Sequence, residues 1–460
     1  MTIVRGRDAG AGAVDLIVDA VEDRSARGLA AAVSRLTRSA ALASGTRLPT
    51  VREVAKRLGV SPTTVSEAWQ TLAQAGVLET RGRLGSFVLD RPRTDGRQRY
   101  RRVTAHGSFA LDLSTGTPDP DLLPDLRPAL ARVGRRPLTT SYLDDPVLPE
   151  LAELLRAQWP FVPGGLTVVD GAMDGLDRIA SQLVRLGDRV LVENPTFPTL
   201  VDLLELLGAE VVGLPLDDQG IVPSALADAL ASAPTALFLQ PRAHNPVGVS
   251  MTPERGAELA ALLAPTEVVV VEDDHAGDIA RARPVSLGSW LPERTVLVRS
   301  FSKSHGPDLR LAAVGGRAEL VARAEARRLV GPGWSSRLLQ AVLVELLTDE
   351  RAGAAVAAAR QRYAERRAGL VAALDERGVR TTGDDGINVW VEVRDERNAS
   401  VALASHGIGV APGTPFCVSA LPADHVRVTV SALRDGTPAL ADALAAAAAG
   451  QGRRAAPVGR

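Results

Sequence analysis

Lysine is almost absent from this chain of 460 residues, and this draws attention to one of its two lysines. The 53 basic residues comprise 51 arginines and only Lys56 and Lys303. Lys303 lies in the stretch VRSFSKSHGPDLRLAAVGG, between Ser302 and Ser304. Arginine stays protonated, whereas a desolvated lysine can lose its proton and form a Schiff base with an aldehyde. Lys303 is therefore either a surface charge or a nucleophilic amine, and its neighbours decide between the two.

Three other segments place polar or flat side chains after apolar, strand-like runs. VVDGAMDGLDRIA predicts a strand, a glycine turn and a helix, and the free amides around Ala172 could hold a phosphate. In VENPTFPTL, Phe197 either packs in a core or stacks on a flat ring. In QPRAHNPVGVS, Asn245 either satisfies its own turn or donates to a phenolate oxygen.

A fourth segment, VVVVEDDHAGD, ends in three acids and His275. A carboxylate such as that of Asp273 at a buried strand end costs free energy unless it is paired, and a protonated pyridine nitrogen would be such a partner. A metal site is the alternative, although no further ligands cluster beside these residues. The sequence therefore favours an organic cofactor over a metal.

The stretch around Lys303 supplies the remaining groups: the hydroxyls of Ser300 and Ser302 and the cation of Arg310. An aldehyde for the lysine, a phosphate, a phenolate and a ring nitrogen occur together in pyridoxal 5′-phosphate (PLP). The residues thus predict a PLP site in which Lys303 carries the Schiff base.

These segments lie within residues 109–447, where short apolar runs alternate with stretches of helical periodicity. The runs VLVEN, TALFLQP, VVVVEDD and TVLVRSFS indicate buried strands, and their alternation with helices indicates an α/β fold with a largely parallel sheet covered on both faces. Polar residues just beyond the ends of such strands line the ligand crevice. We therefore expect the residues named above to meet at one edge of one sheet.

The N-terminal part of the chain predicts a different, mostly α-helical fold. VREVAKRL predicts a helix closed by Gly59, and Ser61 followed by Pro62 begins a second helix. GVLETRGRLGSFVLD then predicts a two-stranded wing with Arg81 and Arg83 near its tip. Together these elements predict a winged helix-turn-helix, and a plain helical hairpin with a solvated polar face is the alternative.

The charge distribution supports a polyanion partner for this first part. Residues 1–104 hold 18 Lys and Arg against 10 Asp and Glu, a net charge of +8, whereas the other 356 residues hold 35 against 44, a net charge of −9. A segment with six arginines, RPRTDGRQRYRRVT, separates the two parts and is either a solvated linker or a further DNA contact. The single cysteine, Cys417, excludes a disulfide framework and fits a reducing cytoplasm, and no stretch is apolar enough for a signal peptide or a membrane span.

The N-terminal motifs are similar to those of a known family. LPT-x-R, GVSPTTV and GVLETRGRLGSFV, in this order, resemble the winged helix of the GntR family of bacterial transcription regulators across most of residues 26–90. The resemblance implies binding to a double-stranded DNA operator. The DNA contacts that it implies are Arg52, Thr63, Thr64, Ser66, Arg81 and Arg83.

The order GAMDG, ENPTF, HNPVG, EDD, SFSKS and HVRVTVSAL resembles the fold-type I aminotransferases over roughly residues 109–447. The resemblance implies that Lys303 forms the Schiff base, Asp273 binds the pyridine nitrogen and Asn245 binds the phenolic oxygen. It also implies a carboxylate clamp at Arg427 and, at Tyr142, a tyrosine lent to the site of a partner subunit in a homodimer. The residues that it places against the cofactor ring and phosphate are Phe197, Ala172, Ser300, Ser302 and Arg310.

With both parts together, the chain resembles the MocR subfamily of GntR-type regulators, which fuse a winged helix to an aminotransferase-like domain. The expected segments are a DNA-binding domain, a basic linker, a large PLP-binding domain, a small C-terminal α+β subdomain and a disordered tail, over residues 1–90, 91–108, 109–355, 356–447 and 448–460. His275 stands where these aminotransferases usually have a tyrosine, and Leu148 where they usually have a glycine. An imidazole can still contact the phenolic oxygen, but its different pKa makes efficient transamination doubtful.

Two functions from different classes remain open at this point. The first is a cytoplasmic, PLP-dependent transcription regulator that senses an amine, an amino acid or PLP and changes its binding to DNA. The second is a working PLP-dependent aminotransferase with an appended DNA-binding domain. The N-terminal domain favours regulation, because an aminotransferase has no evident use for it.

Overall fold

The computed structural model describes residues 9–38, 41–43, 45–74, 77–80, 82, 85–88, 99, 103, 109–136, 141, 144–434 and 437–450. The chain divides into two compact units, the first made mainly of residues 1–98 and the second mainly of residues 99–460, and each is described by itself. Within the described ranges, no helix combines the length and the hydropathy that a membrane crossing requires.

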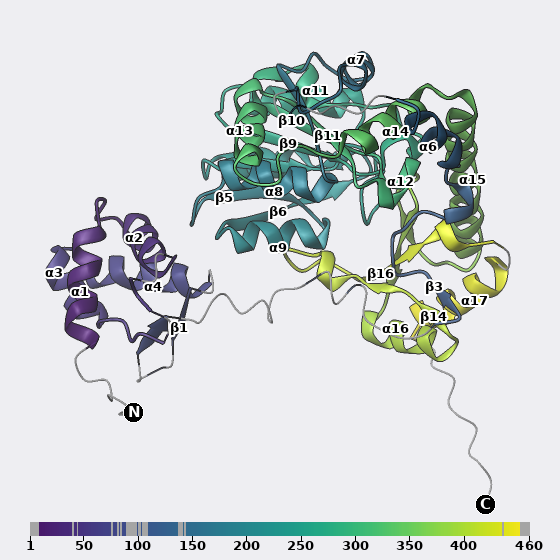
Figure 1. The fold of residues 1–460 in the computed structure, drawn as a ribbon. Coiled ribbons are helices and arrows are strands. Elements are labelled where there is room, and N and C mark those ends of the chain that lie inside the picture. The colour runs from purple at the N-terminus through teal and green to yellow at the C-terminus, as the bar shows by residue number, and fades with distance from the viewer. Residues whose placement is uncertain are drawn as a thin grey trace, which may run out of the picture. The chain divides into compact units, whose positions relative to one another are not determined.

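Among its described residues, the N-terminal unit contains four helices and a two-stranded antiparallel sheet (Figure 1). Its elements are α1 (Ala9–Ala20), α2 (Ala26–Arg38), α3 (Val51–Leu58), α4 (Pro62–Gln74), β1 (Leu78–Thr80) and β2 (Ser86–Val88). The α3–α4 pair and the β1–β2 wing confirm the predicted winged helix-turn-helix. Helix α1 was not expected from the sequence.

Local signals at the ends of α3 and α4 explain why the pair forms. Thr50 caps α3 by accepting a hydrogen bond from the Glu53 amide at 3.3 Å. Gly59 ends α3 in the left-handed region at φ 68°, where a β-carbon would be strained. Ser61 begins α4 by accepting from the Thr64 amide at 3.0 Å. The core beneath these helices includes Ile17, Leu29, Val33, Val54, Leu58, Val65, Trp69, Leu72, Leu78 and Val88.

The second unit is built on an eight-stranded mixed sheet with the order β4-β11-β10-β9-β8-β5-β6-β7. Its strands are β4 (Gly165–Val169), β5 (Arg189–Asn194), β6 (Glu210–Asp217), β7 (Gly220–Ile221), β8 (Ala236–Leu239), β9 (Val269–Asp274), β10 (Thr295–Ser300) and β11 (Ala312–Gly316). The central pairs β5–β8, β8–β9 and β9–β10 are parallel, whereas β11 is antiparallel to both of its neighbours. The predicted α/β fold is confirmed, and the sheet is mixed, with parallel strands at its centre.

Helices pack around this sheet and connect its strands (Figure 1). Helix α8 (Ala172–Leu183) contacts β9, β10 and β11, and α13 (Ala318–Leu329) contacts β4 and β11. The other helices of this part are α6 (Arg127–Val133), α7 (Pro149–Ala157), α9 (Pro198–Leu206), α10 (Pro223–Leu230), α11 (Pro253–Leu263), α12 (Ser302–His305) and α14 (Arg337–Thr348).

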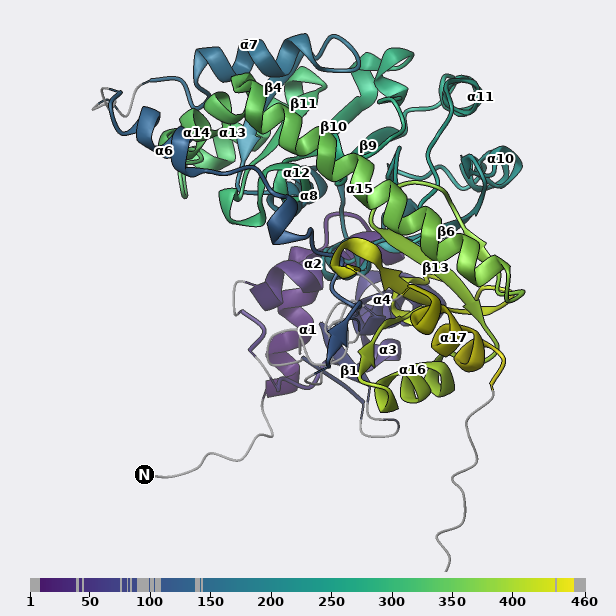
Figure 2. The same ribbon diagram turned by 90° about the vertical axis from the view of Figure 1, so that its right-hand side faces the viewer.

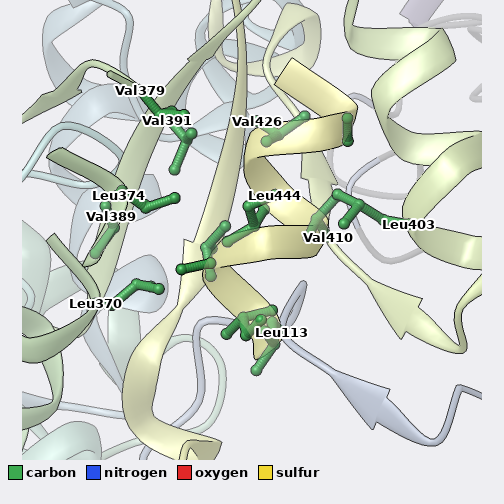
Figure 3. Packing of buried hydrophobic residues seen from close by; sticks show 14 of the residues in the cluster. Leu113, Leu370, Leu374, Val379, Val389, Val391, Leu403, Val410, Val426 and Leu444 are labelled. Carbon is green, nitrogen blue, oxygen red and sulfur yellow. The ribbon is translucent and has the colours of Figure 1, made fainter. Parts of the chain in front are cut away.

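A smaller α+β subdomain completes the unit, with a four-stranded antiparallel sheet in the order β12-β13-β16-β15. Helix α15 (Glu350–Asp375) runs from the large sheet towards it (Figure 2), so the expected boundary at 355/356 falls inside this helix. Its remaining elements are β12 (Thr381–Thr382), β13 (Asn388–Val393), β15 (Ala411–Pro412), β16 (Asp424–Thr429), α16 (Glu396–Ser405), α17 (Thr437–Ala448) and a parallel pair of β3 (Leu111–Asp112) with β14 (Ile408–Gly409). Leu113, Leu370, Val389, Val391, Val426 and Leu444 form its core (Figure 3).

The glycine that ends α3 provides a test of the helix-turn-helix geometry. Gly59→Ala should destabilise the N-terminal unit by about 1 kcal/mol, because an L-residue in the left-handed region is strained. Gly12→Ala is the matched control, since Gly12 lies inside α1 and a β-carbon added there would meet nothing within 4 Å, and it should stabilise by about 0.5–1 kcal/mol. Hydrogen exchange of peptides from this unit measures the change in stability of each variant. Stability changes of the same sign for Gly59→Ala and Gly12→Ala would contradict this geometry.

Candidate functional site

The parallel strands bring their carboxyl ends to one edge of the large sheet. Strands β5, β8, β9 and β10 run in one direction, and β4 joins them because β11 is antiparallel to both β4 and β10. Each strand end or the loop after it carries one or more of the predicted residues. The residues brought to this edge are Ala172 after β4, Phe197 after β5, Asn245 after β8, Asp273 and His275 at the end of β9, Ser300, Ser302 and Lys303 at the end of β10, and Arg310 before β11.

Lys303 lies on the short helix α12, directly after β10, and is half-buried. Burial lowers the pKa of its ammonium group below the usual value, and the positive charge of Arg427 acts in the same direction. The carboxylate of Asp273 opposes this shift. A lysine with a lowered pKa presents a neutral amine more readily, as a nucleophile for an aldehyde requires.

Asp273 is 4% exposed, and its two carboxylate oxygens have different environments. Oδ2 accepts a hydrogen bond from Gln240 Nε2 at 2.9 Å, whereas Oδ1 makes none with the described residues. Burial raises the pKa of this carboxyl group, against the opposing effects of the Gln240 hydrogen bond and the Lys303 charge. A buried acceptor of this kind fits a protonated ring nitrogen, whose charge would lower the pKa again.

The other two acids of the EDD motif are engaged elsewhere. Asp274 forms a bidentate ion pair with buried Arg242, at 2.9 Å from Nε to Oδ1 and 2.7 Å from Nη2 to Oδ2. Glu272 accepts from the Ser286 hydroxyl and the Leu287 amide, and burial raises the pKa of Glu272 to about 7. Among the described residues there is no group of three His, Cys, Asp or Glu side chains that could hold a metal ion. The three acids therefore do not converge on one ligand.

Asn245 is buried, and its hydrogen bonds fix the orientation of its side-chain amide. Oδ1 accepts from Arg427 Nη1 at 3.1 Å and from Asn388 Nδ2 at 3.3 Å. Because a guanidinium can only donate, the oxygen must face Arg427. The Nδ2 group is therefore left as a donor, which is the role that a phenolate oxygen requires.

Arg427 extends from β16 of the small subdomain and is 2% exposed. Besides its bond to Asn245, it donates to the carbonyl of Ser114 and lies 4.9 Å above the centre of the Phe416 ring. Gly116 (φ 66°) leaves room for it, because a β-carbon there would lie 3.3 Å from the guanidinium. A preorganised guanidinium of this kind can bind a carboxylate through two parallel hydrogen bonds.

The start of α8 and the residue before β11 form the part of the site suited to a phosphate. Arg310 donates from Nη2 to the Asp170 carbonyl at 2.9 Å. Gly171 (φ 101°) permits this approach, because a β-carbon there would lie 2.6 Å from Arg310 Nη2. Ala172 begins α8, whose first amides lack helical partners, and the hydroxyl of buried Ser300 accepts from the Ser302 amide at 3.3 Å.

Sequence reasoning missed two residues that support the segment Val168–Asp170, directly before α8. Buried Arg328 on α13 donates to the Val168 carbonyl at 2.6 Å and to Asp170 Oδ2 at 3.1 Å. Ser335 Oγ accepts from Arg328 and donates to Val168 as well. Nothing in the sequence links residues that lie so far apart, so no signal there could have found them.

Phe197 and His275 are both half-buried at this edge of the sheet. Phe197 follows β5 in a loop whose Thr196 amide donates to the Phe416 carbonyl at 2.8 Å. Nδ1 of His275 makes no hydrogen bond with the described residues. Burial and the charge of Lys303 lower the pKa of His275 well below its usual value, so the imidazole is neutral at physiological pH.

The predicted DNA contacts that are described lie on the helix pair. Arg52 on α3 and Thr63 on α4 are exposed, and Ser66 is half-buried. Thr64 is half-buried and its hydroxyl lies 2.8 Å from Ser61 Oγ, so it also takes part in the capping of α4. Arg81, Arg83 and Tyr142, as well as most of the basic linker, lie outside the described residues.

Comparison with family models finds a match for each unit. Residues 110–446 match the family described as aminotransferase class I and II, and residues 26–88 match the bacterial regulatory proteins of the gntR family. The matches cover the sheet with its surrounding site and the helix-turn-helix, respectively.

Three characterised relatives are named as transcription regulators. The chain is 35% identical over 398 residues to the vitamin B6 salvage pathway transcriptional repressor PtsJ of Salmonella typhimurium. The aligned residues make up 84% of this chain and 90% of PtsJ. It is 28% identical to the HTH-type transcriptional regulator TauR of Rhodobacter capsulatus, over 81% of this chain and 85% of TauR. It is 30% identical to the HTH-type pyridoxine biosynthesis transcriptional regulator PdxR of Corynebacterium glutamicum, over 60% of this chain and 62% of PdxR.

Solved structures show the same fold in the second unit. One is LysN, an α-aminoadipate aminotransferase of Thermus thermophilus complexed with N-(5′-phosphopyridoxyl)-L-leucine. It superimposes with a TM-score of 0.67 at 23% identity, and the match covers 76% of this chain and 97% of LysN. An archaeal alanine:glyoxylate aminotransferase gives a TM-score of 0.68 at 22% identity, and the match covers 76% of this chain and 93% of that enzyme. The aminotransferase family match and the donor set of the site together identify PLP as the cofactor.

The two lysines make the covalent assignment directly testable. Borohydride reduction of the protein with PLP should leave a pyridoxyl group on Lys303, because this amine lies beside Asp273 and has a lowered pKa. Peptide mass spectrometry should find the label on Lys303, and Lys303→Ala should abolish it. Lys56→Ala, which alters an exposed lysine of the other unit, is the control and should leave labelling intact. A label on any other residue would rule out this assignment.

Proposed function

Because this chain belongs to the MocR subfamily of GntR-type transcription regulators, we propose that its aminotransferase-like domain is a ligand sensor for the DNA-binding domain. The observation that carries the proposal is that a gntR-type domain and an aminotransferase class I and II domain occur in one chain. The ligand is an amine, an amino acid or a form of vitamin B6, and its binding changes the affinity for a DNA operator.

In this proposal PLP supplies an electrophilic aldehyde and a ring that accepts electrons. Lys303 holds the aldehyde carbon covalently, Asp273 Oδ1 accepts from the ring nitrogen, and Asn245 Nδ2 donates to the phenolic oxygen. His275 lies beside that oxygen as a neutral imidazole. The ring stacks on Phe197, and the groups around the phosphate are the amides at Ala172, the hydroxyls of Ser300 and Ser302, and Arg310.

Arg427 is the proposed detector of a ligand carboxylate. A bidentate carboxylate would use the guanidinium nitrogens that now contact Asn245 Oδ1 and the Ser114 carbonyl. Because Arg427 lies on β16 of the small subdomain and Asn245 in the loop after β8 of the large sheet, carboxylate binding would change the contact between these two parts. This gives the ligand a different affinity for two arrangements of the domain, as a ligand-driven shift requires.

The names of two relatives point to the class of the ligand. PtsJ and PdxR are named for vitamin B6 salvage and pyridoxine biosynthesis, respectively. We therefore propose that this regulator acts in the cytoplasm on genes of vitamin B6 metabolism and that a B6 compound is its first candidate effector. We further propose a homodimer that places Tyr142 at the partner subunit's site. We also propose the segment boundaries given by the sequence, with α15 joining the large and small subdomains.

The second candidate function, an active aminotransferase, is favoured by the match of residues 110–446 to aminotransferase class I and II. The residue that argues against it is His275. A phenol at this position would be an O–H donor over the whole physiological range, whereas the neutral imidazole of His275 has one donor and one acceptor nitrogen. We propose that this exchange slows turnover and preserves ligand binding.

DNA binding should depend steeply on salt, because phosphate contacts release counterions. Arg52→Ala should weaken binding to mixed-sequence duplex DNA and reduce the salt slope by about one unit, and the same holds for Arg81 or Arg83 to Ala. Arg57→Ala is the matched control on the same helix, because Arg57 is ion-paired to Asp15 at 2.5 Å, and it should leave the slope unchanged. Binding titrations at several salt concentrations measure this, and an affinity independent of salt would contradict the proposed interface.

Ligand coupling should separate the regulator from the enzyme. On a duplex selected from a random pool, one compound of a panel of amines, amino acids and B6 compounds should change DNA affinity by ~1–3 kcal/mol. Arg427→Ala should remove the response to carboxylate ligands and retain PLP, whereas His275→Tyr should accelerate the half-reaction with amino acids. Stopped-flow absorbance measures the half-reaction rate, and DNA titration with and without ligand measures the change in DNA affinity. An amino donor that turns over at about 1 s⁻¹ or faster, with no ligand affecting DNA binding, would establish the enzyme instead.

A further inference from the structure

Gln240, the residue directly after β8, contacts two of the proposed cofactor-binding residues at once. Its side chain donates from Nε2 to Asp273 Oδ2 at 2.9 Å and accepts at Oε1 from the Asn245 amide at 2.8 Å. All three residues are 4–5% exposed. We infer that Gln240 is a positioning residue that sets the Asp273 carboxylate for the nitrogen of the cofactor ring, while it also binds the backbone amide of Asn245.

The orientation of the Gln240 amide follows from its partners. The Asn245 backbone N–H can only donate, so Oε1 of Gln240 must face it. Nε2 then faces the Asp273 carboxylate, which can accept. Only this arrangement satisfies both neighbours, and one side chain therefore links the end of β9 to the loop that follows β8.

The backbone of Gln240 is held from the opposite side by a second buried acid. Its amide donates to Glu193 Oε2 at 2.7 Å, and the same oxygen lies 3.2 Å from His244 Nε2. Glu193 and His244 are 2% and 1% exposed. Glu193 thus holds the main chain at Gln240. The side chain of Gln240 binds Asp273 and Asn245 instead.

The hydrogen bond from Gln240 fixes the orientation of the Asp273 carboxylate. With Oδ2 occupied by Gln240, the carboxylate cannot rotate without losing a buried hydrogen bond, and Oδ1 is the oxygen left for the ring nitrogen. A hydrogen bond to an ionised group is roughly twice as strong as one between neutral groups. Loss of the Gln240 amide should therefore weaken cofactor binding through Asp273, not through the general packing of the domain.

This inference rests on the proposed binding of PLP, and a thermodynamic cycle on the full-length protein tests it. PLP dissociation constants are measured by absorbance titration for the wild type, Gln240→Met, Asp273→Ala and the double variant. Gln240→Met should weaken PLP binding about tenfold or more. In the Asp273→Ala background the same change should cost less than about threefold, because the residue through which Gln240 acts is gone.

A matched control and a cofactor analogue separate positioning from packing. Gln340 is also fully buried and donates to the Pro146 and Ser335 carbonyls while accepting from the Leu148 amide. Gln340→Met should leave the PLP dissociation constant within about twofold. An analogue with carbon in place of the ring nitrogen should bind Gln240→Met and wild type about equally, since Oδ1 of Asp273 then has no ring donor to meet.

Gln240→Glu serves as a second variant, for the case that Gln240→Met does not fold. It keeps the acceptor for Asn245 and places a second carboxyl beside Asp273, which Lys303, Glu193 and Asp274 also face. At low pH a shared proton can replace the lost donor, and at high pH two carboxylates repel. Its loss of PLP affinity relative to wild type should therefore grow as the pH rises.

The outcomes distinguish this inference from the function on which it rests. A wild type that binds no PLP overturns both. A wild type that binds PLP, with Gln240→Met unaffected, overturns the inference alone. An equal loss in the wild-type and Asp273→Ala backgrounds, or equal losses for PLP and the carbon analogue, shows that Gln240 does not act through Asp273 and overturns the inference. A loss of PLP affinity in Gln240→Glu that is independent of pH likewise overturns the role of Gln240 as a donor to Asp273.

Discussion

The buried carboxylate of Asp273 is the constraint on which the rest of the site depends. Taking an unpaired carboxylate out of water costs several kcal/mol, so the fold must offer it a partner or raise its pKa. Gln240 binds only one of its oxygens, and Lys303 lowers the pKa that burial raises. Oδ1 makes no hydrogen bond with the described residues, so it remains available for the ring nitrogen that we propose as its partner.

The second constraint is the shared use of Asn245 by the two subdomains. Its side-chain oxygen accepts from Arg427 on β16 and from Asn388 on β13, and its amide group stays available on the large sheet. Asn388 in turn accepts from Thr429, whose hydroxyl also accepts from the Gly116 amide. In the mechanism that we propose, a ligand carboxylate that binds Arg427 would alter this network where the two subdomains meet.

Much of the fold and of the site could be predicted from local pattern. The four apolar runs became β5, β8, β9 and β10, and Gly59 and Ser61 mark the ends of helices as expected. What could not be predicted depends on distant partners: a glutamine after a strand carries no signal until β8 and β9 are known to be neighbours. The same holds for Arg328, which supports the Val168–Asp170 segment from α13. Arg427 was named from the resemblance, but its contact with Asn245, which spans 182 residues, had no signal in the sequence.

His275 shows why a sensor can keep the whole cofactor-binding apparatus of an aminotransferase. Binding needs an acceptor for the ring nitrogen, a phosphate-binding segment and a lysine, all of which depend on the sheet edge and not on His275. Turnover also needs groups that move protons at a suitable pKa, and burial together with nearby cations holds His275 neutral. A substitution confined to this position can therefore slow chemistry while the ligand contacts of Arg427 and Asn245 persist. Because coupling to DNA requires only that a ligand bind two arrangements unequally, the slow turnover that we propose would be no obstacle to regulation.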